Sequence, residues 1–75
     1  MSKLPLISGS EAVKRFEKLG YIVVRQKGSH IRMWHTSNKS KKPLTIPDHE
    51  VLGKGLLRKL LRDAEVSVEE FNQLE

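Results

Sequence analysis

Three side chains suited to nucleic-acid chemistry alternate along one short stretch of the chain, at His30, Arg32 and Trp34. Successive side chains of a β-strand point to opposite faces, so these three share one face if the stretch is a strand. An imidazole can transfer a proton near neutral pH, a guanidinium can bind a phosphate, and an indole can stack on a base. The stretch therefore carries three of the groups that hold and attack a nucleic-acid backbone.

His30 is the strongest candidate for catalysis. It follows Gly28 and Ser29, where the backbone can approach a phosphate closely because glycine has no side chain. The cations Arg25 and Lys27 precede it in the sequence. A lone histidine is more often structural, and that interpretation stays open beside the catalytic one.

The other two histidines are weaker candidates. His35 falls on the core side of its strand and is predicted to be structural, whereas His49 follows Asp48 in a loop, where a surface or capping role is expected. The chain has no cysteine and no HExxH motif, so we expect neither a metal site nor a cofactor. Ser29 and His30 are adjacent on a predicted strand and point to opposite faces, which argues against a Ser-His-Asp triad.

Trp34 and the lysines near it each allow two interpretations. Trp34 either covers the uncovered sheet face together with Tyr21 or serves as a platform for a base. Lys39, Lys41 and Lys42 are either ordinary loop lysines or salt-sensitive phosphate contacts.

The elements that position these residues begin with a helix after a short lead-in over residues 1–7. Ser8 and Glu11 match a capping box, and Gly20 is placed to end the helix. An apolar stripe predicts the buried side of this helix, formed by Ala12, Val13, Phe16 and Leu19. The solvent side is predicted to carry Lys14, Arg15, Glu17 and Lys18.

A hairpin is predicted next, with strands at 21–26 and 29–35 and the turn on Lys27 and Gly28. Its register has two possible forms. A two-residue loop would put Ile22 and Val24 on the core side, whereas a three-residue loop with a bulge at Gly28 would put Tyr21 and Val23 there. A flexible polar loop over 36–42 leads to a third strand over 43–47.

Two more helices complete the prediction. A wide apolar stripe predicts the second helix, formed by Leu56, Leu57, Leu60, Leu61 and Ala64. A second capping-box pattern, Ser67 to Glu70, starts a short third helix. The sequence thus predicts one α+β domain over residues 1–75, in the order α-β-β-β-α-α, with a three-stranded antiparallel sheet covered by helices on one face.

Charge is distributed unevenly along the 75 residues, whose net charge is +5. Residues 25–62 hold ten Lys and Arg against two acids, whereas residues 63–75 hold five acids and no Lys or Arg. A basic body suggests a polyanionic partner, although a solvated surface explains it equally well. No apolar run is long enough to span a membrane and no signal peptide is evident, so we expect a cytoplasmic protein that does not contact membranes.

Short motifs follow one another in a distinctive order along the chain. Gly20-Tyr21 follows the first helix, Lys-Gly-Ser-His ends at His30, Ile46-Pro47 precedes His49, and Gly-Leu-Leu-Arg-Lys-Leu-Leu occupies 55–61. In this order and spacing the chain resembles the HicA-type mRNA interferase toxins over nearly its whole length. It departs from that family where Leu56 stands in place of a common threonine.

The resemblance implies a fold like that of double-stranded-RNA-binding domains and an endoribonuclease that acts on mRNA. It also implies a HicB-type antitoxin that masks the catalytic histidine, which maps onto His30. We expect a metal-independent reaction in which His30 acts as general base or acid; the alternative is a non-catalytic RNA-binding module. The RNA-binding residues that we predict are Arg25, Lys27, Gly28, Ser29, Arg32, Trp34, Lys41 and Lys42.

Overall fold

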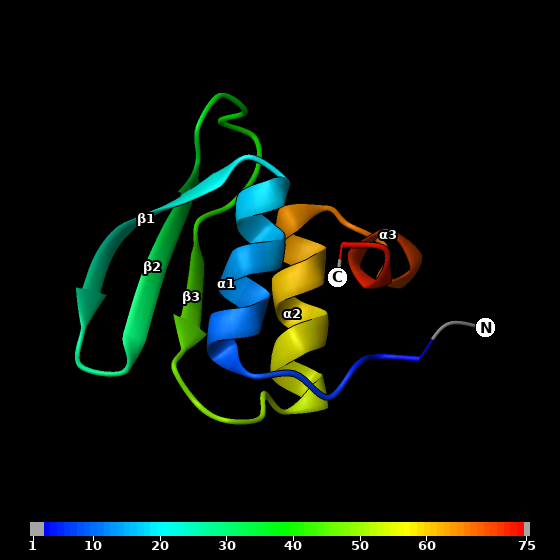
Figure 1. Cartoon of the computed structure of the whole chain (residues 1–75). Coiled ribbons are helices and arrows are strands. Elements are labelled where there is room, and N and C mark those ends of the chain that lie inside the picture. Colours follow the sequence, from blue (N-terminus) through cyan, green and yellow to red (C-terminus); the bar gives the residue numbers. More distant parts are fainter. Residues whose placement is uncertain (1–2, 75) are drawn as a thin grey trace.

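The computed structural model describes residues 3–74; Met1 and Ser2 of the predicted lead-in, and Glu75, lie outside the described residues. The predicted order of elements is confirmed (Figure 1). The elements are α1 (Gly9–Lys18), β1 (Tyr21–Lys27), β2 (His30–His35), β3 (Leu44–Pro47), α2 (Lys54–Ala64) and α3 (Val68–Asn72).

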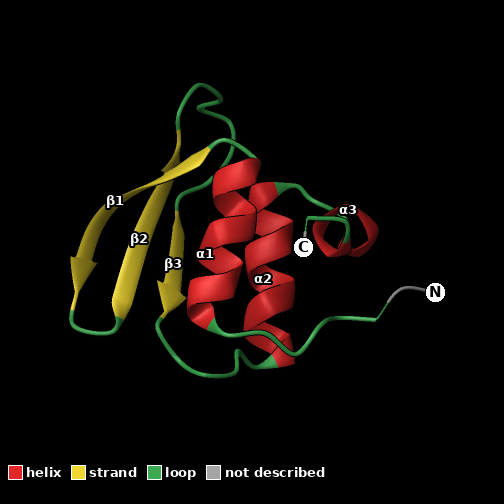
Figure 2. Ribbon diagram, in the orientation of Figure 1, coloured by secondary structure: helices red, strands yellow, loops and turns green. Residues whose placement is uncertain are grey.

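The molecule is built as a sheet beside a layer of helices. The three strands form one antiparallel sheet in the order β1-β2-β3. Figure 2 shows α1 and α2 standing side by side against one face of this sheet, with α3 on the far side of them. This is the α+β arrangement that the sequence predicts. No helix within residues 3–74 is long and apolar enough to cross a membrane.

The core lies between the helices and the covered face of the sheet. Burial alternates along β2 and β3, because every second side chain points toward the helices. The fully buried side chains come from every layer: Ala12, Phe16, Tyr21, Met33, Leu44, Ile46, Leu57, Ala64 and Phe71.

The β1–β2 hairpin differs from the prediction at its turn. Lys27 pairs with His30, so the two turn residues are Gly28 and Ser29, one position later than expected. The positive φ of Gly28, 58°, explains why glycine stands there. The register shifts between Val23 and Arg25, which places an extra residue, Val24, in β1. Neither predicted loop is therefore found, but the second form correctly placed Tyr21 and Val23 on the core side, where Val23 pairs with Met33.

The bulge at Val24 changes which face the end of β1 presents. Without it, Tyr21, Arg25 and Lys27 would all point the same way, because residues at even spacing share a face. With one extra residue inserted, Tyr21 is buried in the core while Arg25 and Lys27 share the other face with His30. Contrary to the first register, Ile22 and Val24 are not core residues.

Both predicted capping patterns are found, but the first is incomplete. The Ser8 hydroxyl accepts a hydrogen bond from the backbone N–H of Glu11 at 3.1 Å. The Glu11 carboxylate accepts from Nε of Arg15 at 3.4 Å instead of returning to the cap. At α3 the capping box is complete, with Ser67 and Glu70 bonded reciprocally.

Arg15 is buried, so its predicted place on the solvent side of α1 is wrong. Its Nη1 donates to the backbone oxygen of Phe71 at 3.2 Å, and its guanidinium lies 5.1 Å from the centre of the Phe71 ring. The third helix covers this side of α1 through Phe71. The buried guanidinium is stabilised by the Glu11 carboxylate of α1 together with the carbonyl and the aromatic face of Phe71.

The end of α1 is joined to the end of β2 through His35. Its Nδ1 accepts from the backbone N–H of Asn38 at 2.9 Å, so the ring proton is on Nε2, which donates to the Leu19 carbonyl at 3.0 Å. The ring also packs edge-on against Tyr21, with centroids 5.1 Å apart. Two bonded ring nitrogens and an aromatic neighbour make His35 structural, as predicted.

Replacing Gly20 with alanine is expected to destabilise the protein by about 1 to 3 kcal/mol, because Gly20 has a φ of 99° and a Cβ there would lie 2.8 Å from Nε2 of His35. Gly55 is the matched control: a Cβ there meets nothing within 4 Å and α2 gains helix propensity. Urea denaturation measures both variants. Equal stability of Gly20→Ala and the unmodified protein would contradict this account of the α1–β2 junction.

Tyr21 makes stability sensitive to alkaline pH. Its hydroxyl donates to the Lys42 carbonyl at 3.0 Å, and burial, followed by the charges of Asp63 and Glu65, raises the pKa of this hydroxyl. The unfolded chain therefore loses the proton at lower pH than the folded protein does. Stability from this group is complete below the unfolded value, about 10, and falls as pH rises through the folded value.

We expect the free energy of unfolding to fall more steeply above about pH 10 in the unmodified protein than in the Tyr21→Phe variant, which has no phenol to ionise. Urea denaturation between about pH 8 and pH 11 measures both. Parallel pH dependences in the two proteins would show that Tyr21 does not titrate differently on folding.

Candidate nucleic-acid interface

The face of the sheet turned away from the helices, which we call the open face, contains a hollow of about 620 Å³. Residues from all three strands line it, and we call it the His30 hollow. They are Val24, Arg25, Lys27, His30, Arg32, Trp34 and Thr45. Its volume lies within the usual range for small-ligand sites, about 300–1,000 Å³, so it can take a nucleotide.

Strand pairing arranges the cations of the His30 hollow in rows. Lys27 lies opposite His30, and Arg25 lies opposite Arg32. Like charges directly opposite each other on a sheet are destabilising. No Asp or Glu is among the lining residues, and the ion pairs seen within residues 3–74, Arg15–Glu11 and Lys59–Asp63, do not involve these cations. The positive charges of Arg25, Lys27 and Arg32 are therefore not balanced by an acidic side chain in the hollow, and an anionic ligand would balance them.

Arg32 is held in place by a neighbour that the sequence analysis missed. Its Nη1 donates to Oγ1 of Thr45 at 2.7 Å, across the β2–β3 pairing. The signal for Thr45 was present, because it stands between the inward-pointing Leu44 and Ile46 and must point outward. The guanidinium is therefore oriented before any ligand arrives.

His30 is exposed at the first position of β2. The preceding turn is fastened to the β3–α2 loop, since the backbone N–H of Asp48 donates to the Ser29 carbonyl at 2.6 Å. Among the described residues none forms a hydrogen bond with the His30 ring. The strand and turn therefore fix the place of His30 on the open face, and neither ring nitrogen is occupied by a hydrogen bond from these residues.

Trp34 lies on the open face with 54% of its surface exposed. Tyr21 is buried on the opposite face, so the predicted pairing of these two rings is wrong. The indole also lines a second, smaller hollow of about 190 Å³, which we call the Lys39 hollow. Its lining residues are Trp34, His35, Asn38, Lys39, Lys41 and Pro43. The indole thus stands between the two hollows.

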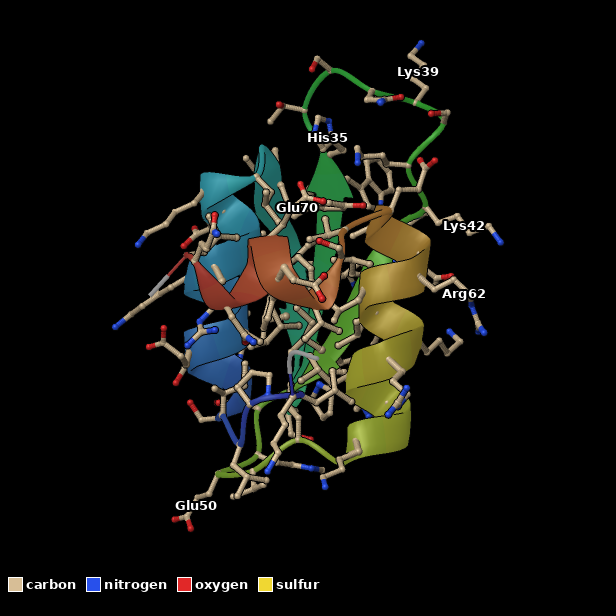
Figure 3. The ribbon with its side chains drawn as sticks, turned by 90° about the vertical axis from the view of Figure 1, so that its right-hand side faces the viewer. His35, Lys39, Lys42, Glu50, Arg62 and Glu70 are labelled. Atoms are coloured by element: carbon tan, nitrogen blue, oxygen red, sulfur yellow. The ribbon has the colours of Figure 1, made fainter. Side chains whose placement is uncertain are left out.

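The loop lysines have separate surroundings. Nζ of Lys41 donates to the Ala64 carbonyl at 2.7 Å, which satisfies the carboxyl end of α2. Figure 3 shows Lys42 pointing to the same side as Arg62 of α2, with Lys39 at the far end of the loop. Neither Lys41 nor Lys42 lines the His30 hollow.

Several hydrogen bonds form within the loop over residues 36–42 and between it and α2. Asn38 accepts hydrogen bonds from Ser40 through its side chain, and the backbone N–H of Lys42 donates to the Asp63 carbonyl. His49 is exposed in the β3–α2 loop and lies outside both hollows. No three His, Cys, Asp or Glu side chains within residues 3–74 gather as metal ligands would.

Comparison with known proteins identifies the family. No curated protein and no solved structure is significantly similar to the chain. A family model described as the HicA toxin of bacterial toxin–antitoxin systems matches residues 9–66, which include every residue of the His30 hollow and leave α3 outside. Because this match covers well over half of the chain, the protein belongs to the HicA toxin family, whose members are paired with an antitoxin.

Proposed function

We propose that the chain is an endoribonuclease that cleaves mRNA in the cytoplasm, with His30 as its general base. Membership of a toxin family supports a damaging activity. The observation that carries the proposal is the His30 hollow, in which one exposed imidazole lies among three cations and no acid. A phosphodiester is the substrate that fits a proton-transfer group surrounded by positive charge.

RNA supplies its own nucleophile, so a shallow site with few groups is sufficient. His30 takes the proton from a ribose 2′-hydroxyl, whose oxygen forms a bond to the adjacent phosphorus as the bond from phosphorus to the 5′-oxygen breaks. The products are a 2′,3′-cyclic phosphate and a 5′-hydroxyl. The leaving oxygen takes its proton from water, a lysine or the protonated His30. No step requires a metal ion.

The cations of the His30 hollow stabilise the charge that develops on the phosphate. Arg32 is oriented by Thr45 before binding, and Arg25 lies opposite it, so the two guanidinium groups can share one phosphate. Lys27 is paired with His30 and is the cation nearest to the imidazole in the strand pairing. The turn formed by Gly28 and Ser29 allows the sugar–phosphate backbone to come close.

The same face is a suitable target for the antitoxin of the pair. We propose a HicB-type antitoxin that places an anionic surface over His30 and Arg32, because charge complementarity favours such a contact and covering the imidazole prevents RNA from reaching it. A toxin–antitoxin complex in which both residues stay exposed would contradict this mode of inhibition.

The second candidate function is RNA binding without cleavage. It is favoured by one observation, that no described residue orients the His30 ring through a hydrogen bond, as a third group does in many catalytic sites. The cations would then bind phosphates without chemistry. Intact RNA recovered from a salt-sensitive complex would favour this function.

His30→Ala is expected to lower the rate of RNA cleavage at least about 100-fold, because a positioned acid–base group contributes roughly 10²–10⁴. The matched control is His49→Ala, which removes an exposed histidine outside the hollow and should leave the rate unchanged. Cleavage of an RNA oligonucleotide in excess EDTA is measured for all three proteins, and the products are examined for a 2′,3′-cyclic phosphate.

Two results would contradict the proposal. Equal cleavage by the unmodified protein and His30→Ala would remove His30 from the reaction. Cleavage of an oligonucleotide that carries 2′-deoxyribose at the cleaved position would remove the 2′-hydroxyl as nucleophile.

A further inference from the structure

We infer that Trp34 stacks on an unpaired base of a single RNA strand bound beside His30, and that the strand continues past the indole to Lys39. The inference rests on the proposed function, because it takes His30 as the position of cleavage. It adds a base-binding subsite and restricts the substrate to RNA that is single-stranded at this site.

The spacing of side chains along β2 supports this assignment. His30, Arg32 and Trp34 occupy alternate positions on the open face, so a proton-transfer group, a phosphate ligand and an aromatic ring follow one another along one line. The whole line spans roughly 13 Å at about 3.3 Å per residue. A nucleic-acid strand lying along β2 therefore meets the imidazole, the guanidinium and the indole in turn.

Among residues 3–74 the Trp34 indole contacts no other aromatic ring. The ring contacts among the described residues join Phe16, Tyr21, His35 and Phe71, all on the covered side of the sheet. Trp34 nevertheless forms a wall of both hollows and is half exposed. An exposed aromatic ring between positively charged groups is the arrangement that proteins use to hold single strands, since every base offers a flat face.

A duplex cannot use this surface in the same way. In a double helix both faces of each base are covered by its neighbours, and A-form RNA is recognised mainly through its phosphates and 2′-hydroxyls. The His30 hollow is lined on one side by the indole, so a base has to leave the stack to reach it. The geometry therefore favours a single strand over a paired one.

The Lys39 hollow indicates where the RNA strand continues beyond Trp34. Of its two lysines, Lys41 has its amine bonded to the Ala64 carbonyl, whereas Lys39 is exposed at the far end of the loop (Figure 3). A strand that leaves the His30 hollow over the indole passes into the Lys39 hollow. Lys39 is then the cation available to the next phosphate.

Trp34 is the only tryptophan, so its fluorescence reports directly on this subsite. The probe is a short 2′-O-methyl RNA, which has no free 2′-hydroxyl and stays intact, offered single-stranded or annealed to its complement. We expect the single strand to quench the fluorescence saturably and the duplex to leave it nearly unchanged. Equal quenching by both, or none by the single strand, would overturn the inference.

Binding of the labelled single strand is then compared among variants. Trp34→Ala is expected to weaken binding about 5- to 150-fold, the range expected for loss of one base-stacking contact, while Trp34→Phe keeps most of the affinity. Val51→Ala is the matched control, because Val51 is 57% exposed and lies outside both hollows. Equal losses for Trp34→Ala and Val51→Ala would contradict stacking.

The path to Lys39 has its own readout. Lys39→Gln is expected to reduce the slope of log affinity against log salt by roughly 0.7 for a single strand, the change for one phosphate contact. An unchanged slope would overturn this part of the path.

The outcomes also separate this inference from the proposed function. Cleavage of unmodified RNA without quenching of Trp34 would refute stacking and leave the role of His30 intact. Quenching and a Trp34→Ala effect without cleavage would refute the chemistry and support the subsite.

Discussion

The single inserted residue at Val24 is the constraint on which the site depends. A regular strand would force the aromatic start of β1 and its cationic end onto the same face of the sheet. One of the two would then be misplaced, because burying Arg25 and Lys27 without partners costs several kcal/mol each, while exposing Tyr21 removes a core side chain. The bulge lets Tyr21 pack under the helices and turns both cations toward His30.

The two faces of the sheet divide stability and function between them. The covered face carries the buried side chains of β2 and β3 and the His35 ring that joins Leu19 to the loop after β2. The contacts among side chains of the open face add little to stability, because Arg25 lies directly opposite Arg32. The two guanidinium groups repel each other unless an anion lies between them. The open face is therefore well suited to bind a phosphate.

Features set by local sequence were predicted well. The order of elements, the cap at Ser8, the glycine after α1 and the alternation along β2 follow from short-range periodicity and backbone geometry. The bulge at Val24 and the exact turn were not predicted. The position of an extra residue depends on burying Tyr21 while exposing the cations of β1, and this requirement cannot be read from a short stretch of sequence.

Distant contacts account for the other errors. Arg15 is buried because α3, far along the chain, packs over it. Lys41 bonds to the end of α2, a contact that no local pattern indicates, and its role in RNA binding stays a prediction. Thr45 could have been found by extending the alternation argument from β2 to β3.

The most direct test of this account is the reactivity of cysteines placed singly at each position from 30 to 34, in a chain that otherwise has no cysteine. Under native conditions a water-soluble thiol reagent should modify positions 30, 32 and 34 rapidly and positions 31 and 33 slowly. Slow modification at position 30, or similar rates at all five positions, would show that the side chain at position 30 does not project into the His30 hollow. Either result would contradict the account.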